Sequence, residues 1–102
     1  MPTLDQLEKL LAVDPGDAFV LYGLAQEHAK RGDTAKAVEF YDKCLAVDPA
    51  YCYASFHKAK TLHEAGRTTQ AAEVLREGLS RARAIGDAHA ASEISGFLDE
   101  VT

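Results

Sequence analysis

A five-residue block occurs twice in this chain, and the spacing of the two copies restricts the folds that the chain can adopt. Leu11–Pro15 has the sequence LAVDP, and the same five letters return at Leu45–Pro49, 34 residues further on. The same shift carries Ala25 onto Ala59. A fixed period of roughly 20 to 50 residues is typical of stacked supersecondary units, in which each unit covers the apolar face of the next. The sequence therefore predicts an array of repeats.

Within each repeat, capping and breaking residues predict two helices joined by a sharp turn. Asp17 can accept hydrogen bonds from the first N–H groups of a helix, and Gly32 can take the left-handed conformation that ends it. Pro49 ends the following helix, because proline disfavours helical geometry in the residue before it. We expect helices over about 18–31, 34–47, 50–65 and 69–85.

One further helix is expected on each side of the repeats. Thr3 and Gln6 can form a capping box for an opening helix that runs to Val13. Asp87 can cap a closing helix near the end of the sequence. No segment alternates apolar and polar residues with a period of two, so we expect no sheet.

This pattern resembles the tetratricopeptide repeat. The first repeat meets the family's spaced signature at Leu21, Leu24, Ala25, Ala37, Tyr41 and Pro49. The second repeat departs from it, with Ser55 in the slot for a large residue, Lys58 in the leucine slot and Arg83 in the proline slot. Such departures fit a terminal repeat, which a different closing helix can cover.

The resemblance implies an all-α fold, a right-handed helix-turn-helix array or α-solenoid, with about five helices. We expect one domain over 1–102, with an opening helix over 3–13, repeats over 18–51 and 52–85, and a capping helix over 87–101. Small residues are expected where the two helices of a repeat cross, because a methyl group lets the axes approach at the short end of the roughly 8 to 10 Å range. Those residues are Ala25, Ala37, Ala59 and Ala71.

The first helix of each repeat carries a second stripe of side chains that its partner helix does not need. In the family, this side of the array is a concave groove in which partner segments lie. The resemblance therefore implies a partner-binding groove formed by Phe19, Tyr22, Gln26, Tyr53, Phe56, Lys60 and His63. Aromatic side chains suit this role, because they give rigid contact area at a small entropic cost.

Packing within the chain is the alternative role for these aromatics. The opening or the closing helix could fold over Phe19 and Phe56 and bury them. Tyr22 and Tyr53 have hydroxyls that suit a half-wet site. Family members that hold a terminal carboxylate use a clamp of lysine, asparagine and arginine, but the matching places here hold Tyr22, Gln26 and His57. A carboxylate-terminated chaperone tail is therefore not the expected partner.

The charge pattern disfavours nucleic acid as a partner. The net charge is −5, and Lys and Arg occur singly or in short pairs, so no basic stripe could neutralise phosphates. The longest apolar stretch, Ala18–Ala25, is far shorter than the roughly 20 residues that cross a bilayer. We expect a cytoplasmic protein without nucleic-acid or membrane contacts.

No arrangement of residues in the sequence indicates a catalytic or metal site. The four histidines show no i, i+4 pairing, and neither cysteine lies three or four residues from a histidine. Cys44 is expected to be a buried, inert thiol. Cys52 opens a helix, where the helix dipole could stabilise a thiolate, although an ordinary helix-start residue is the favoured interpretation. No cofactor is expected.

The sequence thus predicts a small non-catalytic module that binds a segment of another protein in an aromatic groove. The alternative is a structural role, in which the groove or the leucine-rich opening helix mediates homo-oligomerisation. That helix contains Leu4, Leu7 and Leu11 on one stripe.

Overall fold

Six α-helices form within residues 2–102, the part of the chain that the computed structural model describes, and none of these residues lies in a strand. The helices are α1 (Leu4–Val13), α2 (Ala18–Lys30), α3 (Thr34–Val47), α4 (Cys52–Glu64), α5 (Thr68–Ala84) and α6 (Ala88–Val101). The predicted all-α helix-turn-helix array is confirmed. Both flanking helices form beside the four helices of the repeats, as their caps predict, so the total is six where about five helices were expected.

Side-chain caps set the starts of four helices. Asp17 Oδ1 accepts from the N–H groups of Phe19 at 3.0 Å and Val20 at 3.2 Å, and Thr3 and Gln6 form the predicted capping box. Asp33 and Asp87 accept in the same way at the starts of α3 and α6. The turns after α2, α4 and α5 each contain a glycine with φ between 76° and 81°: Gly32, Gly66 and Gly86. These glycines adopt the left-handed conformation at little steric cost.

The start of α4 differs from the expected position. This helix begins at Cys52, two residues after the predicted start at Ala50. Asp48 Oδ1 accepts from the Ala50 N–H at 3.1 Å, and the Asp48 carbonyl accepts from the Tyr51 N–H at 3.1 Å. These two bonds close a turn, which delays the first helical residue.

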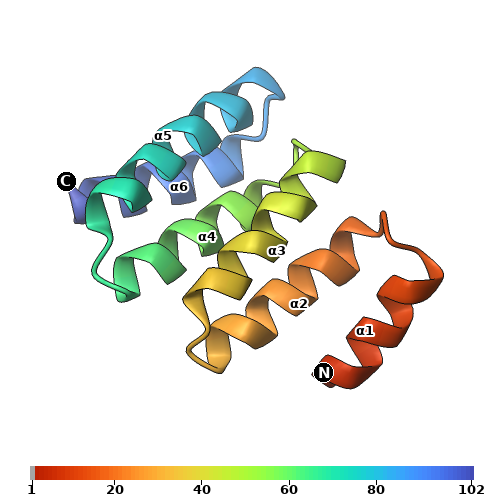
Figure 1. Ribbon diagram of the computed structural model, residues 1–102. Helices are drawn as coiled ribbons and strands as arrows, with labels where there is room; N and C mark the ends of the chain where they lie inside the picture. The colour runs from red at the N-terminus through yellow and green to blue at the C-terminus, as the bar shows by residue number, and fades with distance from the viewer. Residues whose placement is uncertain (1) are drawn as a thin grey trace.

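The helices stack in chain order, so each packs mainly on its neighbours in sequence (Figure 1). Helix α2 packs on α3, α4 packs on α5, and α5 packs on α6. Helix α4 also contacts α2 on one side and α6 on the other, whereas α1 packs on α2. Helices α2, α4 and α6 therefore form one layer of the array, and α3 and α5 form a second layer.

Alanines make the close contacts inside both repeats. Ala25 and Ala37 have no exposed surface between α2 and α3, and Ala59 and Ala71 have none between α4 and α5. The larger side chain of Tyr41 fills space around the first of these crossings and is almost completely buried. The buried apolar residues form neighbouring clusters along the array, as expected when each unit covers the next.

The structure explains why the second repeat has a serine where the family pattern expects a large residue. Ser55 is buried against Gly78 of α5, and a Cβ atom at Gly78 would lie only 2.9 Å from the Ser55 Cβ. The same Cβ would lie 3.5 Å from Ile94 Cδ1 of α6. The small pair therefore admits the side chain of Ile94, which anchors the closing helix.

Leucine in place of Ala25 or Ala71 is predicted to lower the free energy of unfolding by about 1 to 3 kcal/mol, because the added methylenes enter a close helix crossing. Ala35→Leu is the matched control, since Ala35 is exposed on α3, and its effect is expected to stay within about 0.5 kcal/mol. Urea denaturation of the three variants measures these differences. Equal midpoints would contradict the assigned helix crossings.

Candidate functional site

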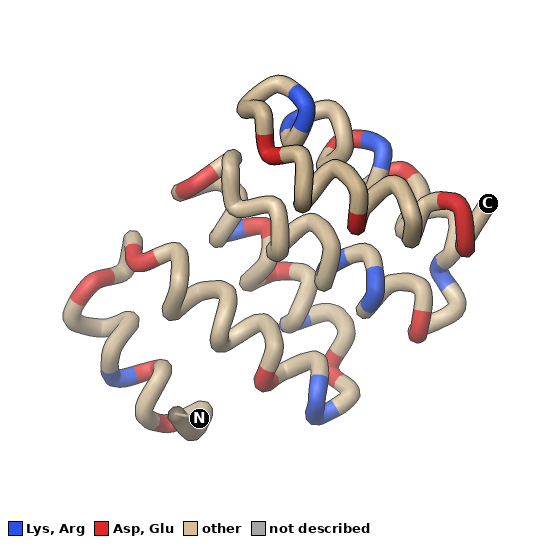
Figure 2. Tube along the Cα trace, turned by 180° about the vertical axis from the view of Figure 1, so that it is seen from behind, with Lys and Arg blue, Asp and Glu red and all other residues tan. Residues whose placement is uncertain are grey.

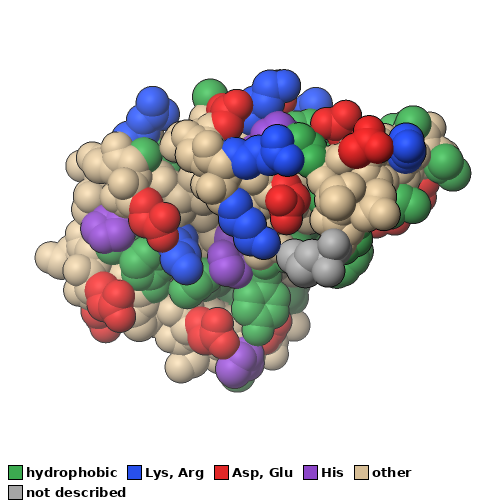
Figure 3. All heavy atoms as spheres, turned by 90° about the horizontal axis from the view of Figure 1, so that it is seen from below, with side chains coloured by type: hydrophobic (Ala, Val, Ile, Leu, Met, Phe, Trp, Pro, Cys, Tyr) green, Lys and Arg blue, Asp and Glu red, His purple; other side chains and the backbone are tan. Residues whose placement is uncertain are grey.

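The layer of α2, α4 and α6 has two adjoining hollows on its open face. One lies between α4 and α6 and has a volume of about 470 Å³. The other lies between α2 and α4, with Tyr41 of α3 at its wall, and has a volume of about 230 Å³. Lys60 and Glu64 of α4 line both hollows. We call the two hollows together the groove. Figure 3 shows hydrophobic side chains on one face of the molecule, with histidine, acidic and basic side chains around them.

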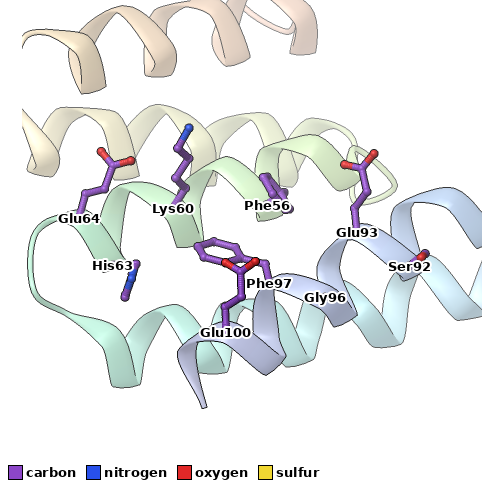
Figure 4. A pocket seen from close by; sticks show the side chains of 9 residues that line it. All are labelled: Phe56, Lys60, His63, Glu64, Ser92, Glu93, Gly96, Phe97 and Glu100. Carbon is purple, nitrogen blue, oxygen red and sulfur yellow. The ribbon is translucent and has the colours of Figure 1, made fainter.

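Two phenylalanines line the hollow between α4 and α6. Phe56 of α4 and Phe97 of α6 have ring centroids 5.3 Å apart, and the centroids of the His63 and Phe97 rings lie 5.9 Å apart in an edge-to-face arrangement. Glutamates from both helices surround these rings, and Gly96 of α6 lies among them (Figure 4). The hollow therefore combines an aromatic surface with a charged rim.

A cluster of rings lies at the start of the groove. The Tyr22 ring centroid lies 5.1 Å from that of Tyr51, 5.7 Å from that of His57 and 6.1 Å from that of Tyr41. Gln26 Nε2 donates a hydrogen bond to Tyr22 Oη at 3.1 Å. Tyr22 is thus half-buried and held by contacts from three helices and a turn.

Burial keeps the polar groups of this cluster uncharged. It raises the pKa of Tyr22 to about 12, with smaller contributions from Tyr51, Cys44 and Tyr53. Burial, with the nearby Lys60 ammonium, lowers the pKa of His57, and Glu93 opposes this effect. Tyr22 is therefore a neutral phenol and His57 a neutral imidazole near pH 7. Both can exchange hydrogen bonds with a partner without carrying charge.

The structure brings some of the predicted groove residues together and separates others. Gln26, Phe56, Lys60 and His63 line the two hollows, and Tyr22 stands beside them through its bond to Gln26. Phe19 and Tyr53 do not line either hollow. They are the second residues of α2 and α4, and their side chains are 70% and 46% exposed. The opening helix therefore leaves Phe19 exposed, whereas the closing helix partly covers Phe56 through Phe97.

Sequence reasoning missed the contribution of α6 to this face. The residues that it supplies are Ser92, Glu93, Gly96, Phe97 and Glu100. The last helix was expected only to cap the array. The order of the helices could have predicted this contribution, because a helix that follows a complete pair lies in the same layer as α2 and α4. Glu64 was also missed as a groove-lining residue, whereas His57, which the sequence places at a clamp position of the groove, lines the hollow between α2 and α4.

The cysteines lie inside the fold. Cys44 has no exposed surface, its Sγ donates to the Ala18 carbonyl at 3.3 Å, and burial raises its pKa to about 11. Cys52 is also buried, and burial followed by the Asp87 carboxylate raises its pKa. The surroundings of Cys52 therefore disfavour a thiolate, although this residue lies at the start of α4. Within residues 2–102, no three His, Cys, Asp or Glu side chains form a group that could hold a metal ion.

Hydropathy and length rule out a bilayer-crossing helix among the six, within the part of the chain that the structure describes.

Comparisons with known proteins agree with the architecture. A family model described as the tetratricopeptide repeat matches residues 18–51. A TPR repeat-containing protein of Pseudomonas aeruginosa is 30% identical over 95 residues, which cover 93% of this chain and 90% of that protein.

Solved structures share the fold. The solution NMR structure of a tetratricopeptide repeat domain protein from Salinibacter ruber has 30% sequence identity and a TM-score of 0.78, over 86% of this chain and 89% of that one. The type III secretion chaperone SycD of Yersinia enterocolitica, in complex with a peptide of the translocator YopD, has a TM-score of 0.82 at 19% identity. That match covers 96% of this chain and 76% of SycD, and it shows the fold alone.

The lowered pKa of His57 predicts a pH-dependent stability. The unfolded chain takes up the His57 proton near pH 6.5, whereas the folded protein takes it up only at lower pH. The free energy of unfolding should therefore fall as the pH drops below about 6.5, and level off below the folded pKa. Urea denaturation between about pH 7.5 and pH 5 measures this loss.

The His57→Gln variant is the control for this measurement, because it removes the titrating group and leaves the other histidines in place. Its stability should fall less over the same interval. An equal loss in both proteins would contradict the assignment to His57.

Proposed function

Because this chain belongs to the tetratricopeptide repeat family, we propose that it is a non-catalytic interaction module that binds a segment of another protein in the groove of α2, α4 and α6. The SycD structure, which resembles this chain in fold, contains a peptide of YopD. That example supports peptide binding as a use of the architecture. The cytoplasmic location expected from the sequence stays a prediction.

The observation that carries the proposal is the set of aromatic side chains left partly accessible along one layer. Phe56 and Phe97 line the wider hollow, and Tyr53 and Phe19 are exposed aromatic residues near the starts of α4 and α2. Packing of the array explains the burial of Tyr41, but it gives no reason for the exposure of Phe19 and Tyr53. Aromatic residues that are half-exposed on a rigid surface are typical anchors in protein interfaces.

The groove suits an extended or helical segment that lies across the array. Its walls belong to helices that are packed into the array, so little of the surface has to be ordered when a segment binds. The neutral Tyr22 and His57 offer hydrogen bonds beside the aromatic rings. Apolar side chains of the partner would enter the hollows, while its backbone remained near the polar rim.

A second candidate function is homo-oligomerisation through α1. Leu7 of this helix is buried against α2, but Leu10 and Val13 are 50% and 86% exposed. These two side chains form an apolar surface that a second copy could cover. Sedimentation across a range of concentrations separates the two functions, because a monomer at high concentration would exclude assembly through α1.

The Tyr53→Ala variant is predicted to bind a partner peptide more weakly by about 1 to 2 kcal/mol, the range in which interface anchors begin. Its stability should change by about 0.5 kcal/mol or less, since the ring is 46% exposed. The probe is a fluorescently labelled peptide, selected on the wild-type protein from a display library of random peptides. Fluorescence anisotropy and urea denaturation give both quantities.

Ile85→Ala is the matched control, because Ile85 is similarly exposed but lies at the end of α5, outside the layer of α2, α4 and α6 that contains Tyr53. It should leave the affinity unchanged. Tyr22→Ala should lower both affinity and stability, because its ring packs on three others. Equal affinities of the wild-type protein and Tyr53→Ala for the peptide would show that Tyr53 is not an anchor. If the wild-type protein selected no peptide from the library, the proposed function would be contradicted.

A further inference from the structure

Three glycines lie inside helices, and packing explains two of them. A Cβ atom at Gly78 would lie 2.9 Å from the Ser55 Cβ, and one at Gly23 would lie 3.3 Å from Leu7 Cδ2. A Cβ atom at Gly96 would meet nothing within 4 Å. Glycine inside a helix is destabilising relative to alanine. The fold therefore has no packing reason for the glycine at position 96.

The position of Gly96 suggests a different reason. It lines the hollow between α4 and α6, three residues after Glu93 and four residues before Glu100 (Figure 4). These spacings place the three residues on one face of α6. Because Gly96 has no side chain, the helix backbone is open to the hollow between the two carboxylates. A ligand can therefore approach the backbone at Gly96 more closely than it could at a residue that has a side chain.

The charges around the hollow are unbalanced. Glu64, Glu93 and Glu100 contribute carboxylates, whereas Lys60 is the one Lys or Arg side chain of the lining. Glu93 Oε1 also contacts His89 Nε2 at 2.5 Å. Helix α6 contains three acidic residues and neither Lys nor Arg, and Figure 2 shows acidic positions along it toward the C-terminus. The hollow therefore attracts a positive group.

We propose that the hollow between α4 and α6 receives a lysine or arginine side chain of the partner segment, with the segment's backbone close to Gly96. This inference rests on the proposed function of the groove. The alkyl stem of the basic residue lies against Phe56 and Phe97, and its cationic end lies at the acidic rim that Glu93 and Glu100 form on either side of Gly96 (Figure 4). Long basic side chains suit such a site, because their stems cover apolar surface while their ends remain near charge. Carboxylates add charge-assisted hydrogen bonds to that end.

The test starts from the display library of random peptides, selected on the wild-type protein near physiological salt. The selected peptides should be enriched in Lys or Arg next to an apolar residue, relative to the unselected library. The double variant Glu93→Gln, Glu100→Gln should bind a selected peptide about tenfold more weakly or worse, equivalent to about 1.4 kcal/mol. The control is Glu73→Gln, Glu77→Gln, which removes two exposed carboxylates from α5, outside the groove, and should leave the affinity unchanged.

Gly96→Ala supplies a readout that a merely structural role would not give. The added methyl group meets no neighbour, so Tm should rise, by about 4 °C if the full helix-propensity gain is realised. The same variant should bind the selected peptide at least about fivefold more weakly, equivalent to about 1 kcal/mol. A more stable protein that binds less well is expected only if the space over Gly96 is used by the ligand.

The outcomes separate this inference from the function on which it rests. Selected peptides that depend on Tyr53 but show no Lys or Arg enrichment, and that bind both variants as tightly as wild type, would overturn the inference and leave the groove function standing. Failure to select any peptide would remove both. A lower Tm for Gly96→Ala would also overturn the inference, because it would give the glycine a packing role.

Discussion

The close approach of paired helices at buried alanines is the contact on which the rest of this structure depends. Ala25 and Ala37 bring α2 and α3 together, and Ala59 and Ala71 do the same for α4 and α5. A larger residue at these positions would separate the axes and shift the next pair. Because each helix pair packs on the pair before it, a change in the distance between two axes at one crossing would shift the pairs that follow.

The same contact produces the groove. Since α2, α4 and α6 lie in one layer, their open faces lie side by side, and the second stripes of α2 and α4 meet the side chains of α6 there. The pairs leave polar and aromatic groups on this face that the core does not use. Burial keeps Tyr22 and His57 neutral, while the glutamates around Phe97 provide charge at one end. The groove therefore has neutral polar groups between α2 and α4 and several carboxylates between α4 and α6.

The repeat made most of the fold predictable, because the returning LAVDP block, the aspartate caps and the glycine turns are local signals. The delayed start of α4 was not predictable, since it depends on Asp48 closing a turn with Ala50. Phe19 and Tyr53 of the predicted stripes lie outside both hollows. In the site, four lining residues on α2 and α4 followed from the stripe pattern. The residues of α6 did not, because its sequence does not repeat that stripe and its place depends on Ile94 packing over Gly78 and Ser55.

Backbone amide chemical shifts would show whether the face of α2, α4 and α6 is the binding surface. A selected peptide would be titrated into the isotopically labelled protein. Binding in the groove should concentrate the shift changes on the groove residues of those three helices, with little change on the outer faces of α3 and α5. Changes concentrated on α1, or on α3 and α5, would contradict the account.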